Sequence, residues 1–255
     1  IKFFVMTNKY KYFVANWKMF GDLKSVKSTN KVIKLMNSIK FNKVKIIYCP
    51  PFTLLNNFVL KFKNSKINIG AQNCHQSNDY GPYTGSINSK MIKELGCKYI
   101  ILGHSENRLE GETNSLINKK IKASLKNKLN VLLCIGETFK EKKLNKTKKI
   151  LASQIIKSLT DIKHLKNIII AYEPVWSIGT GIIPKQHDLI NNVSYIKNLL
   201  KKKYKLKSPK VLYGGSVNSQ NIKELSKIGQ IDGFLIGGAS QNSNKFIDII
   251  KKTFN

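Results

Sequence analysis

The chain has 255 residues, 42% of them hydrophobic, and its formal net charge is +31 at pH 7. This length permits two small domains or one large barrel, and the apolar fraction is sufficient for a substantial core. The sequence contains no run of about 18 apolar residues, which excludes an ordinary membrane-spanning helix.

The first residues, Ile1 to Tyr12, include no acidic residue but several Lys and aromatic side chains. We expect residues 1–11 to form an N-terminal extension and residues 12–255 to form one domain. The extension fits the remnant of an organelle-targeting segment, and equally an ordinary extension. The expected compartment is therefore the cytoplasm or an organelle such as a plastid.

Eight short apolar runs, rich in β-branched residues, recur along the chain. Runs that are apolar at nearly every position are typical of strands buried on both faces, as in a parallel sheet. The predicted strands are Tyr12–Asn16, Val44–Cys49, Ile67–Ala71, Tyr99–Leu102, Val131–Ile135, Ile168–Tyr172, Val211–Tyr213 and Phe234–Ile236.

Lys-rich segments with apolar residues at helical spacing separate these runs. Two of them, Val26–Ile39 and Ile190–Leu200, are predicted to be amphipathic helices. Regular alternation of strands and helices predicts an α/β fold, a single-domain (β/α)8 TIM barrel. An open doubly wound sheet would also alternate, but the Gly-x-Gly-x-x-Gly fingerprint expected after its first strand is absent.

The basic residues are spread along the whole chain, and all but one are lysine. Their spread and the abundance of Asn and Ile indicate a compositional bias at tolerant surface positions. A polyanion-binding role is the alternative, but no RNA-binding aromatic pattern or helix-turn-helix signal accompanies the charge, so neither a nucleic-acid nor a membrane partner is expected. The only arginine, Arg108, suggests a position that needs a planar fork of donors.

The four cysteines are far apart in the sequence and form no Cys-x-x-Cys pair. They are Cys49, Cys74, Cys97 and Cys134. This spacing favours neither a metal site nor a disulfide framework. We expect buried free thiols and no metal centre.

Functional residues of a parallel barrel follow the carboxyl ends of its strands. The polar residues and glycines at these positions are Asn16, Lys18, His104, Ser105, Glu106, Glu173, Gly214, Gly215, Ser216, Gly237 and Gly238. Glycines after the seventh and eighth strands expose backbone N–H groups ahead of short helices. They predict a cradle for an anion such as phosphate.

Glu173 stands between an apolar strand and Pro174, where partial desolvation of its carboxylate suits a general base. His104 begins a predicted helix, and a helix N-terminus disfavours the imidazolium form. The segment 174–181 has a rigid proline, an apolar body and glycine joints. These features fit a lid that closes over a reactive intermediate and excludes water, although the segment taken alone fits an ordinary βα loop better.

Together these residues resemble the motifs of the triosephosphate isomerase family, in the order of that family and over residues 12–250. The motifs are Ala-Asn-Trp-Lys-Met (15–19), Gly-His-Ser-Glu (103–106), Cys-Ile-Gly-Glu (134–137), Ala-Tyr-Glu-Pro-Val-Trp (171–176), Ile-Gly-Thr-Gly (178–181), Tyr-Gly-Gly-Ser-Val (213–217) and Gly-Gly-Ala-Ser (237–240). The resemblance implies an isomerase of carbohydrate metabolism, in glycolysis and gluconeogenesis.

The resemblance implies interconversion of dihydroxyacetone phosphate and D-glyceraldehyde 3-phosphate through an enediol or enediolate, without a cofactor. By this resemblance, Glu173 would be the base, His104 the neutral electrophile and Lys18 the electrostatic stabiliser. Asn16 would be a donor that also positions Lys18, and Glu106 would pair with Lys18 or support the site. Backbone N–H groups of Gly179, Ser216, Gly237 and Gly238 would bind the phosphate. Cys134 and Glu137 would support the lid, and Arg108 would be a structural partner near the fourth strand.

The family is usually dimeric, which implies that the long loop 72–87 enters the site region of a second copy. Thr84 would then reach towards Asn16 and His104 of that copy, and Met19 would sit in the pocket that the loop enters. Ser86 and Asn107 stand where the family often has a Glu and an Arg that pair across the dimer. Because both are lost and the surface is rich in Lys, we expect a weakened, salt-sensitive homodimer.

Two further departures concern a buried ion pair and the lid. Lys197 replaces a family arginine that pairs with the acid matching Asp232, so at most a single contact is expected. Ser177 replaces the commoner alanine. The lid also ends in Ile-Ile-Pro (182–184), a shortened hinge without its usual lysine.

Another phosphate-binding barrel, such as a sugar-phosphate epimerase, would share the glycines after the last two strands. It would not require Asn16, Lys18, His104 and Glu173 together, and its site would more often show pairs of metal-ligating His and Asp. A binding protein built on an old enzyme fold is a second alternative, supported only by the net charge.

Overall fold

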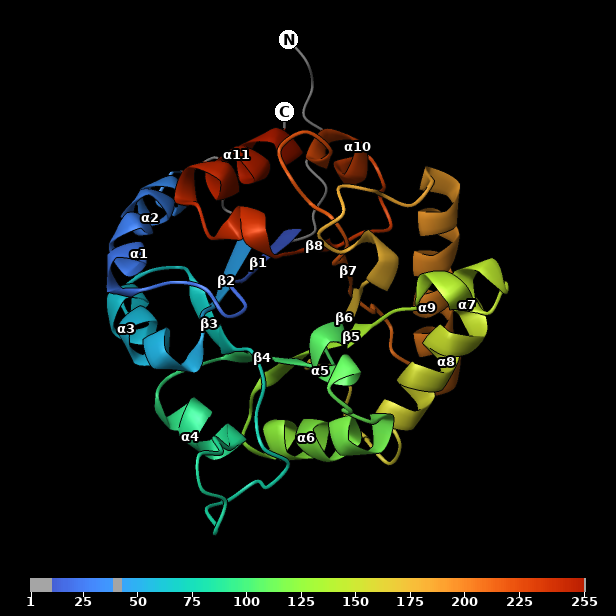
Figure 1. Cartoon of the computed structure of the whole chain (residues 1–255), viewed down its shortest axis with the longest axis horizontal. Helices are drawn as coiled ribbons and strands as arrows, with labels where there is room; N and C mark the ends of the chain where they lie inside the picture. Colours follow the sequence, from blue (N-terminus) through green and yellow to red (C-terminus); the bar gives the residue numbers. More distant parts are fainter. Residues whose placement is uncertain (1–10, 39–42, 255) are drawn as a thin grey trace.

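A computed structural model describes residues 11–38 and 43–254, in which eight parallel strands close into a barrel surrounded by helices (Figure 1). Strand β1 pairs with β2 on one side and with β8 on the other, which closes the ring. The predicted α/β class and the (β/α)8 barrel are therefore confirmed.

The strands lie within one residue of the predicted runs. They are β1 (Lys11–Asn16), β2 (Val44–Cys49), β3 (Asn68–Ala71), β4 (Tyr99–Leu102), β5 (Asn130–Ile135), β6 (Ile168–Tyr172), β7 (Val211–Tyr213) and β8 (Gly233–Ile236). Lys11 already belongs to β1, one residue before the expected start of the barrel. The rest of the expected extension lies outside the described residues.

Side chains that alternate across the strands build two separate apolar layers, which explains why the strands read as continuous apolar runs. One layer fills the barrel interior and includes Val14, Ile47 and Leu132. The other lies between strands and helices and includes Phe13 and Ile46. The four cysteines are buried free thiols, as predicted.

Helices cover the outside of the barrel. The α-helices are α1 (Leu23–Ser28), α2 (Asn30–Met36), α3 (Phe52–Phe62), α4 (Ser89–Glu94), α5 (Ser105–Leu109), α6 (Asn114–Lys126), α7 (Phe139–Lys143), α8 (Thr147–Ser158), α9 (Gln186–Tyr204), α10 (Ile222–Ser226) and α11 (Ser243–Thr253). Two short 3-10 helices, η2 (Val175–Ser177) and η3 (Gly238–Ser240), follow β6 and β8.

The predicted helix over Val26–Ile39 is two helices, because Thr29 interrupts it. The buried Thr29 hydroxyl donates to the carbonyl of Val26 at 2.7 Å, which ends α1 before α2 begins. Ile39 lies outside the described residues. The predicted helix Ile190–Leu200 is the middle of the longer α9.

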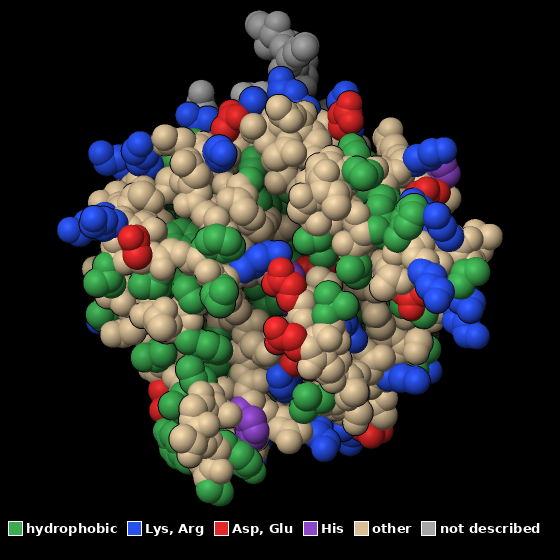
Figure 2. Space-filling view, viewed as in Figure 1, with side chains coloured by type: hydrophobic (Ala, Val, Ile, Leu, Met, Phe, Trp, Pro, Cys, Tyr) green, Lys and Arg blue, Asp and Glu red, His purple; other side chains and the backbone are tan. Residues whose placement is uncertain are grey.

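Lys and Arg side chains are distributed around the rim of the face shown in Figure 2, not gathered into one patch. This distribution agrees with the view that the charge of the chain lies on solvated helix faces. Within residues 11–38 and 43–254, no helix combines the length and the apolar character required to cross a bilayer.

Candidate active site

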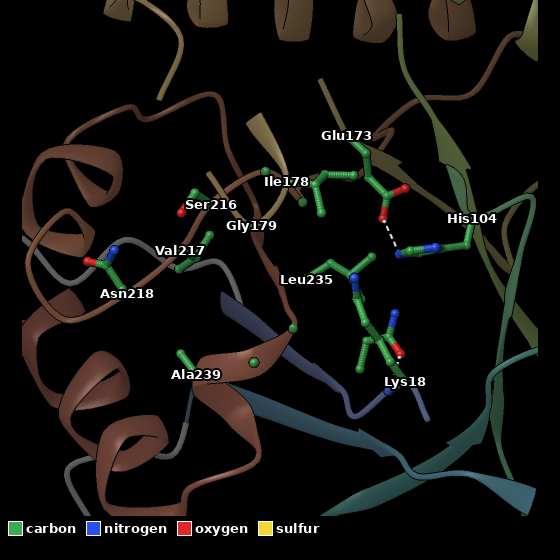
Figure 3. Close-up of a pocket in the computed structure, with 15 residues that line it drawn as sticks. Lys18, His104, Glu173, Ile178, Gly179, Ser216, Val217, Asn218, Leu235 and Ala239 are labelled. Carbon is green, nitrogen blue, oxygen red and sulfur yellow. Dashed lines mark hydrogen bonds and ion pairs between the residues drawn. The ribbon is translucent and has the colours of Figure 1, made fainter. Parts of the chain in front are cut away.

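A cavity of about 240 Å³ opens at the carboxyl ends of the strands (Figure 3). Its lining comes from five strand ends and the segment after β6. The lining residues are Asn16, Lys18, His104, Glu173, Ile178, Gly179, Gly214, Gly215, Ser216, Val217, Asn218, Leu235, Gly237, Gly238 and Ala239. Eight of the predicted site residues thus meet around one cavity: Asn16, Lys18, His104, Glu173, Gly179, Ser216, Gly237 and Gly238.

Glu173 follows β6 directly and is held by the barrel ladder, where its N–H donates to the carbonyl of Ile135 at 2.8 Å. Its side chain is only 2% exposed. Among the described residues, its Oε1 has no hydrogen-bond partner. A buried carboxylate oxygen without a donor is costly unless a ligand or a conformational change supplies one. The Glu173 carboxylate is therefore free to accept a hydrogen bond or a proton from a molecule bound in the cavity.

Two glycines make room for Glu173, one beside its side chain and one beside its backbone. A Cβ at Gly214 would lie 2.7 Å from Cγ of Glu173, and a Cβ at Gly136 would overlap the Glu173 carbonyl. On the barrel side lies the thiol of Cys134, whose pKa is raised well above its usual value by burial and further by the Glu173 carboxylate. The position of Glu173 is thus constrained by the neighbouring backbone and by the Cys134 thiol.

His104 caps the N-terminus of α5 and faces Glu173 across the cavity (Figure 3). Its Nδ1 accepts the backbone N–H of Glu106 at 3.3 Å, so this nitrogen carries no proton. In the neutral ring the proton then sits on Nε2, which lies 3.5 Å from Oε1 of Glu173. The hydrogen bond from Glu106 therefore favours the tautomer that donates from Nε2 into the cavity.

Lys18 supplies the cation of the site. Its φ of 56° places it in the left-handed region, which is uncommon for a residue with a side chain and often marks functional positions. The Lys18 N–H donates to Oδ1 of Asn16 at 3.1 Å, and its carbonyl accepts from Gln72 at 2.9 Å. Its Nζ contacts Oε1 of Glu106 at 2.6 Å. These contacts orient the ammonium towards the cavity.

Opposite these groups lies the glycine-rich wall. Gly237 and Gly238 follow β8, and η3 begins at Gly238. Ser216 follows the two glycines after β7, and Gly179 lies in the segment after β6. Backbone N–H groups ahead of a short helix suit an anion, because no side chain blocks the approach.

The segment after β6 is anchored by its aromatic residue. The indole N–H of Trp176 donates to Oε1 of Glu137 at 3.0 Å, and Nζ of Lys142 lies 3.8 Å from the ring centroid. Burial raises the pKa of Glu137, while hydrogen bonds from Trp176 and Tyr172 act against that rise. Residues 179–182 are exposed, so the segment has a buried stem and a free tip.

Arg108 donates hydrogen bonds from all three nitrogens of its guanidinium group, which explains the single arginine in a lysine-rich chain. It donates to the carbonyl of Gly103 at 2.7 Å, to Asn114 at 2.6 Å and to the carbonyl of Cys134 at 3.2 Å. These contacts tie β4 to β5 beneath the cavity. Lys197, in contrast, makes a single contact with Asp232 at 2.6 Å, as expected for an ammonium.

Thr84 is not part of this cavity: it lies exposed on the loop 72–87. The sequence reasoning also did not single out several residues in and around the cavity. Gln72 and Gly136 follow β3 and β5 directly, so the rule that reads residues after each strand could have found them. Ile178 and Leu235 are apolar lining residues, and no chemical signal in the sequence sets them apart.

Among residues 11–38 and 43–254, no group of three or more His, Cys, Asp or Glu side chains is placed to hold a metal ion. The groups around the cavity are instead a carboxylate, an imidazole, an ammonium and backbone donors. Such a set suits proton transfer on an anionic substrate. A parallel barrel with this set at its strand ends is typical of barrel enzymes that act on anionic substrates.

The chain belongs to the triosephosphate isomerase family. The family model "Triosephosphate isomerase" matches residues 11–253. Members of this family are intramolecular aldose–ketose isomerases, and this chain is accordingly an isomerase.

Similar proteins support this assignment over nearly the whole chain. Triosephosphate isomerase of Alkaliphilus metalliredigens is 39% identical over 92% of this chain and 96% of its own length. Triosephosphate isomerase of Dictyoglomus turgidum is 38% identical over 94% of this chain and 98% of its own length. The crystal structure of triosephosphate isomerase from Bartonella henselae, 35% identical, superposes with a TM-score of 0.86 over 95% of this chain and 98% of that chain.

Proposed function

We propose that this chain interconverts dihydroxyacetone phosphate and D-glyceraldehyde 3-phosphate, without a cofactor, through an enediolate intermediate. The observation that carries the proposal is the pairing of Glu173 and His104. A buried carboxylate oxygen without a hydrogen-bond partner in the described chain faces Nε2 of a neutral imidazole at 3.5 Å, opposite a glycine-rich wall. A substrate placed between them would have its carbon next to a base and its oxygens next to donors.

In the proposed reaction, Glu173 removes a proton from the carbon next to the carbonyl group. The electron pair of that C–H bond forms the double bond of the enediolate, and negative charge develops on the carbonyl oxygen. Lys18 and the Nε2 proton of His104 lie on the same side of the cavity and would stabilise this charge. His104 moves a proton between the two oxygens, and the Glu173 carboxyl returns its proton to the neighbouring carbon.

Asn16 and Glu106 act through Lys18 in this proposal. Asn16 accepts the Lys18 N–H, and Glu106 pairs with its ammonium, so both hold the cation at the cavity. The ion pair with Glu106 is half exposed and therefore contributes position more than stability. The backbone N–H groups of Gly179, Ser216, Gly237 and Gly238 would bind the phosphate, and the segment 174–184 would act as a lid that excludes water.

The most direct test is a coupled isomerase assay on the purified chain, repeated with a chelator. We expect activity that the chelator leaves unchanged, because no metal takes part in the proposed chemistry. In heavy water, the proton held on the Glu173 carboxyl exchanges with solvent, so NMR should detect deuterium at the product carbon to which Glu173 returns it. Activity abolished by the chelator, or turnover without any exchange of that hydrogen, would contradict the mechanism.

We also propose that the chain forms a homodimer through the loop 72–87. Apolar side chains around this loop and after β1 support the proposal: Met19 is 92% exposed and Tyr83 is 48% exposed. In a second copy, Thr84 would approach the site near Asn16 and His104, with Met19 against the loop.

The dimer is expected to be weak and salt-sensitive. Ser86 and Asn107 cannot form an ion pair across the interface, and the net charge of +31 makes the two copies repel. Sedimentation velocity at low and high salt measures this: dissociation should be greater at low salt, where the repulsion is less screened. A tight dimer that is indifferent to salt would refute the expectation.

A further inference from the structure

Ser177 lies at the end of η2, and its side chain is fully buried at the base of the lid. Its Oγ contacts three groups from different parts of the chain. The carbonyl of Ile182 lies at 2.6 Å, the hydroxyl of Tyr213 at 3.0 Å and the backbone N–H of Ser216 at 3.3 Å. The hydroxyl thus joins the two ends of the lid to the end of β7 and to the loop that follows it.

The directions of these hydrogen bonds follow from counting protons. A carbonyl only accepts, so the single O–H proton of Ser177 is donated to Ile182. A backbone N–H only donates, so Ser216 gives its proton to Oγ. The remaining lone pair of Oγ accepts the O–H of Tyr213. Burial raises the pKa of Tyr213 to about 12, so its hydroxyl stays protonated at neutral pH. The Ser177 hydroxyl is therefore saturated, with one bond donated and two accepted.

The glycine at 215 makes this arrangement possible. A Cβ at Gly215 would lie 2.6 Å from Oγ of Ser177 and would overlap the hydroxyl of Tyr213. The bare backbone therefore accommodates both hydroxyl groups at the point where the lid stem meets the loop after β7. An alanine at position 177, the residue that is commoner in the family, would leave Tyr213, Ile182 and Ser216 without this shared partner.

We propose that Ser177 is a positioning residue that latches the lid and competes with the phosphate of the substrate for the N–H of Ser216. This inference rests on the proposed function, in which that N–H is a phosphate donor. An N–H held by Oγ is not available to the phosphate, so the ligand has to displace Ser177 before it binds fully. Displacement also loosens the bond between Ser177 and Ile182, which couples arrival of the phosphate to movement of the lid.

The latch lowers the affinity for phosphate, so its removal should raise that affinity. In Ser177→Ala, we expect inorganic phosphate to bind about fivefold more tightly, the factor that one modest hydrogen bond contributes. KM for the triose phosphate should fall in about the same proportion, while kcat does not rise. Isothermal titration with inorganic phosphate and steady-state kinetics measure the two quantities.

Ser124→Ala is the matched control, because Ser124 is also a fully buried serine but lies on α6, where its hydroxyl contacts only the Cys74 thiol at 3.7 Å among the described hydrogen bonds. It should leave the phosphate affinity unchanged. Tyr213→Phe removes one donor to Oγ but keeps the contacts of Ser177 with Ile182 and Ser216. Its phosphate affinity should stay within about twofold of the wild type, since the competition persists.

Several outcomes would overturn the latch. One is a folded Ser177→Ala protein that binds phosphate no more tightly than the wild type. Another is Tyr213→Phe tightening the binding as much as Ser177→Ala does, because general loosening would then explain the effect. Should the alanine variant fail to fold, Ser177→Cys replaces it: its thiol is a weak acceptor, so tighter phosphate binding is again expected, and its absence refutes the proposal.

The test also separates this inference from the proposed function. A wild-type chain that neither isomerises triose phosphate nor binds inorganic phosphate refutes both proposals. A wild-type chain that does both, with unchanged phosphate affinity in the Ser177 variants, refutes only the latch.

Discussion

The floor of the cavity and the segment 174–184, which we propose as its lid, are built in opposite ways. The floor consists of residues at strand ends, where backbone hydrogen bonds between strands fix the chain. The N–H of Glu173 donates to the carbonyl of Ile135, and the N–H of Gly214 donates to the carbonyl of Tyr172. The lid has a buried stem, but residues 179–182 at its tip are exposed. The floor is thus preorganised, whereas the lid depends on a few side-chain contacts that can be exchanged.

Around the cavity, the departures from the family pattern follow the same division. The residues proposed for chemistry on the floor keep the family identities, while Ser177 and the Ile-Ile-Pro hinge (182–184) change the lid. A floor that positions reacting atoms tolerates little change, since a displacement of about 1 Å is enough to slow catalysis strongly. A lid tolerates substitutions that change the free energy between its open and closed states by about the contribution of one hydrogen bond.

The sharpest test of the floor is Glu173→Asp. The shorter side chain withdraws the carboxylate by about 1 Å, so kcat should fall on the order of 100-fold or more while the barrel folds normally. The coupled assay measures the rate, and thermal melting followed by circular dichroism checks the fold. Glu224→Asp, the same change at an exposed site on α10, should keep wild-type turnover. Near-normal turnover of Glu173→Asp would exclude Glu173 as the base.

Gly214→Ala displaces the proposed base, Glu173, without altering its side chain. The added methyl group would lie 2.7 Å from Cγ of Glu173, so the carboxylate has to move, and kcat should fall by about 10- to 100-fold. Gly229→Ala is the matched control, because a Cβ there meets no described atom within 4 Å. Equal kinetics of the two alanine variants would show that the position of Glu173 is not as constrained as its contacts indicate.

This contrast also explains how far the sequence could be read. Strand positions were predictable within a residue because strands buried on both faces must be apolar throughout. The residues of the cavity followed from reading what comes after each strand, and the same rule applied strictly would have added Gln72 and Gly136. The break at Thr29 was missed, because apolar periodicity does not register a hydroxyl that bonds back to Val26.

The contacts of Ser177 could not be predicted from the sequence at all. They join residues from separate segments, and a Ser in place of Ala carries no sign of its partners. The same holds for Trp176, because its neighbour Glu137 follows β5 and its neighbour Lys142 lies on α7. Long-range side-chain contacts depend on the folded geometry, which explains why the lid was the less predictable half of the site.

The buried thiol of Cys74, which follows β3 and packs against Ser124 of α6, predicts a pH effect on stability. Burial raises the pKa of Cys74 to about 11, from an ordinary value of 9.0. Above pH 9 the thiol ionises in the unfolded chain but not in the folded one, so ionisation favours unfolding and its stabilising contribution is lost as pH rises towards the folded pKa. The free energy of unfolding of wild type minus that of Cys74→Ala should therefore decrease between pH 8 and pH 10.5.

Urea unfolding at several pH values measures this difference. Taking wild type against Cys74→Ala cancels the effect of lysine deprotonation, which both proteins share. Between pH 6 and pH 8 the difference should stay constant, because the thiol is protonated in both states. A difference that stays constant up to pH 10.5, or increases, would contradict the burial of this thiol.

The smallest expected effect concerns the stem of the lid. Lys142→Met removes the ammonium 3.8 Å from the Trp176 ring centroid, and an exposed contact of this kind contributes about 0.5 to 1 kcal/mol. If the stem holds the lid, kcat/KM should change by only about twofold to fivefold. Lys143→Met, on the same helix but placed over Phe139 at 4.7 Å, is the matched control and should change it less.

Fluorine NMR of fluorotryptophan-labelled protein connects this change to the lid itself, because the chain has two tryptophans, Trp17 in the core and Trp176 in the stem. Lys142→Met should shift the Trp176 resonance and leave that of Trp17 in place. A shift of both would mean that the substitution disturbs the barrel. If neither resonance moves while kcat/KM falls, Lys142 acts on the charged substrate through its electrostatic field. The contact between Lys142 and Trp176 would then not hold the lid, and the proposed division between a fixed floor and an exchangeable lid would not include this stem.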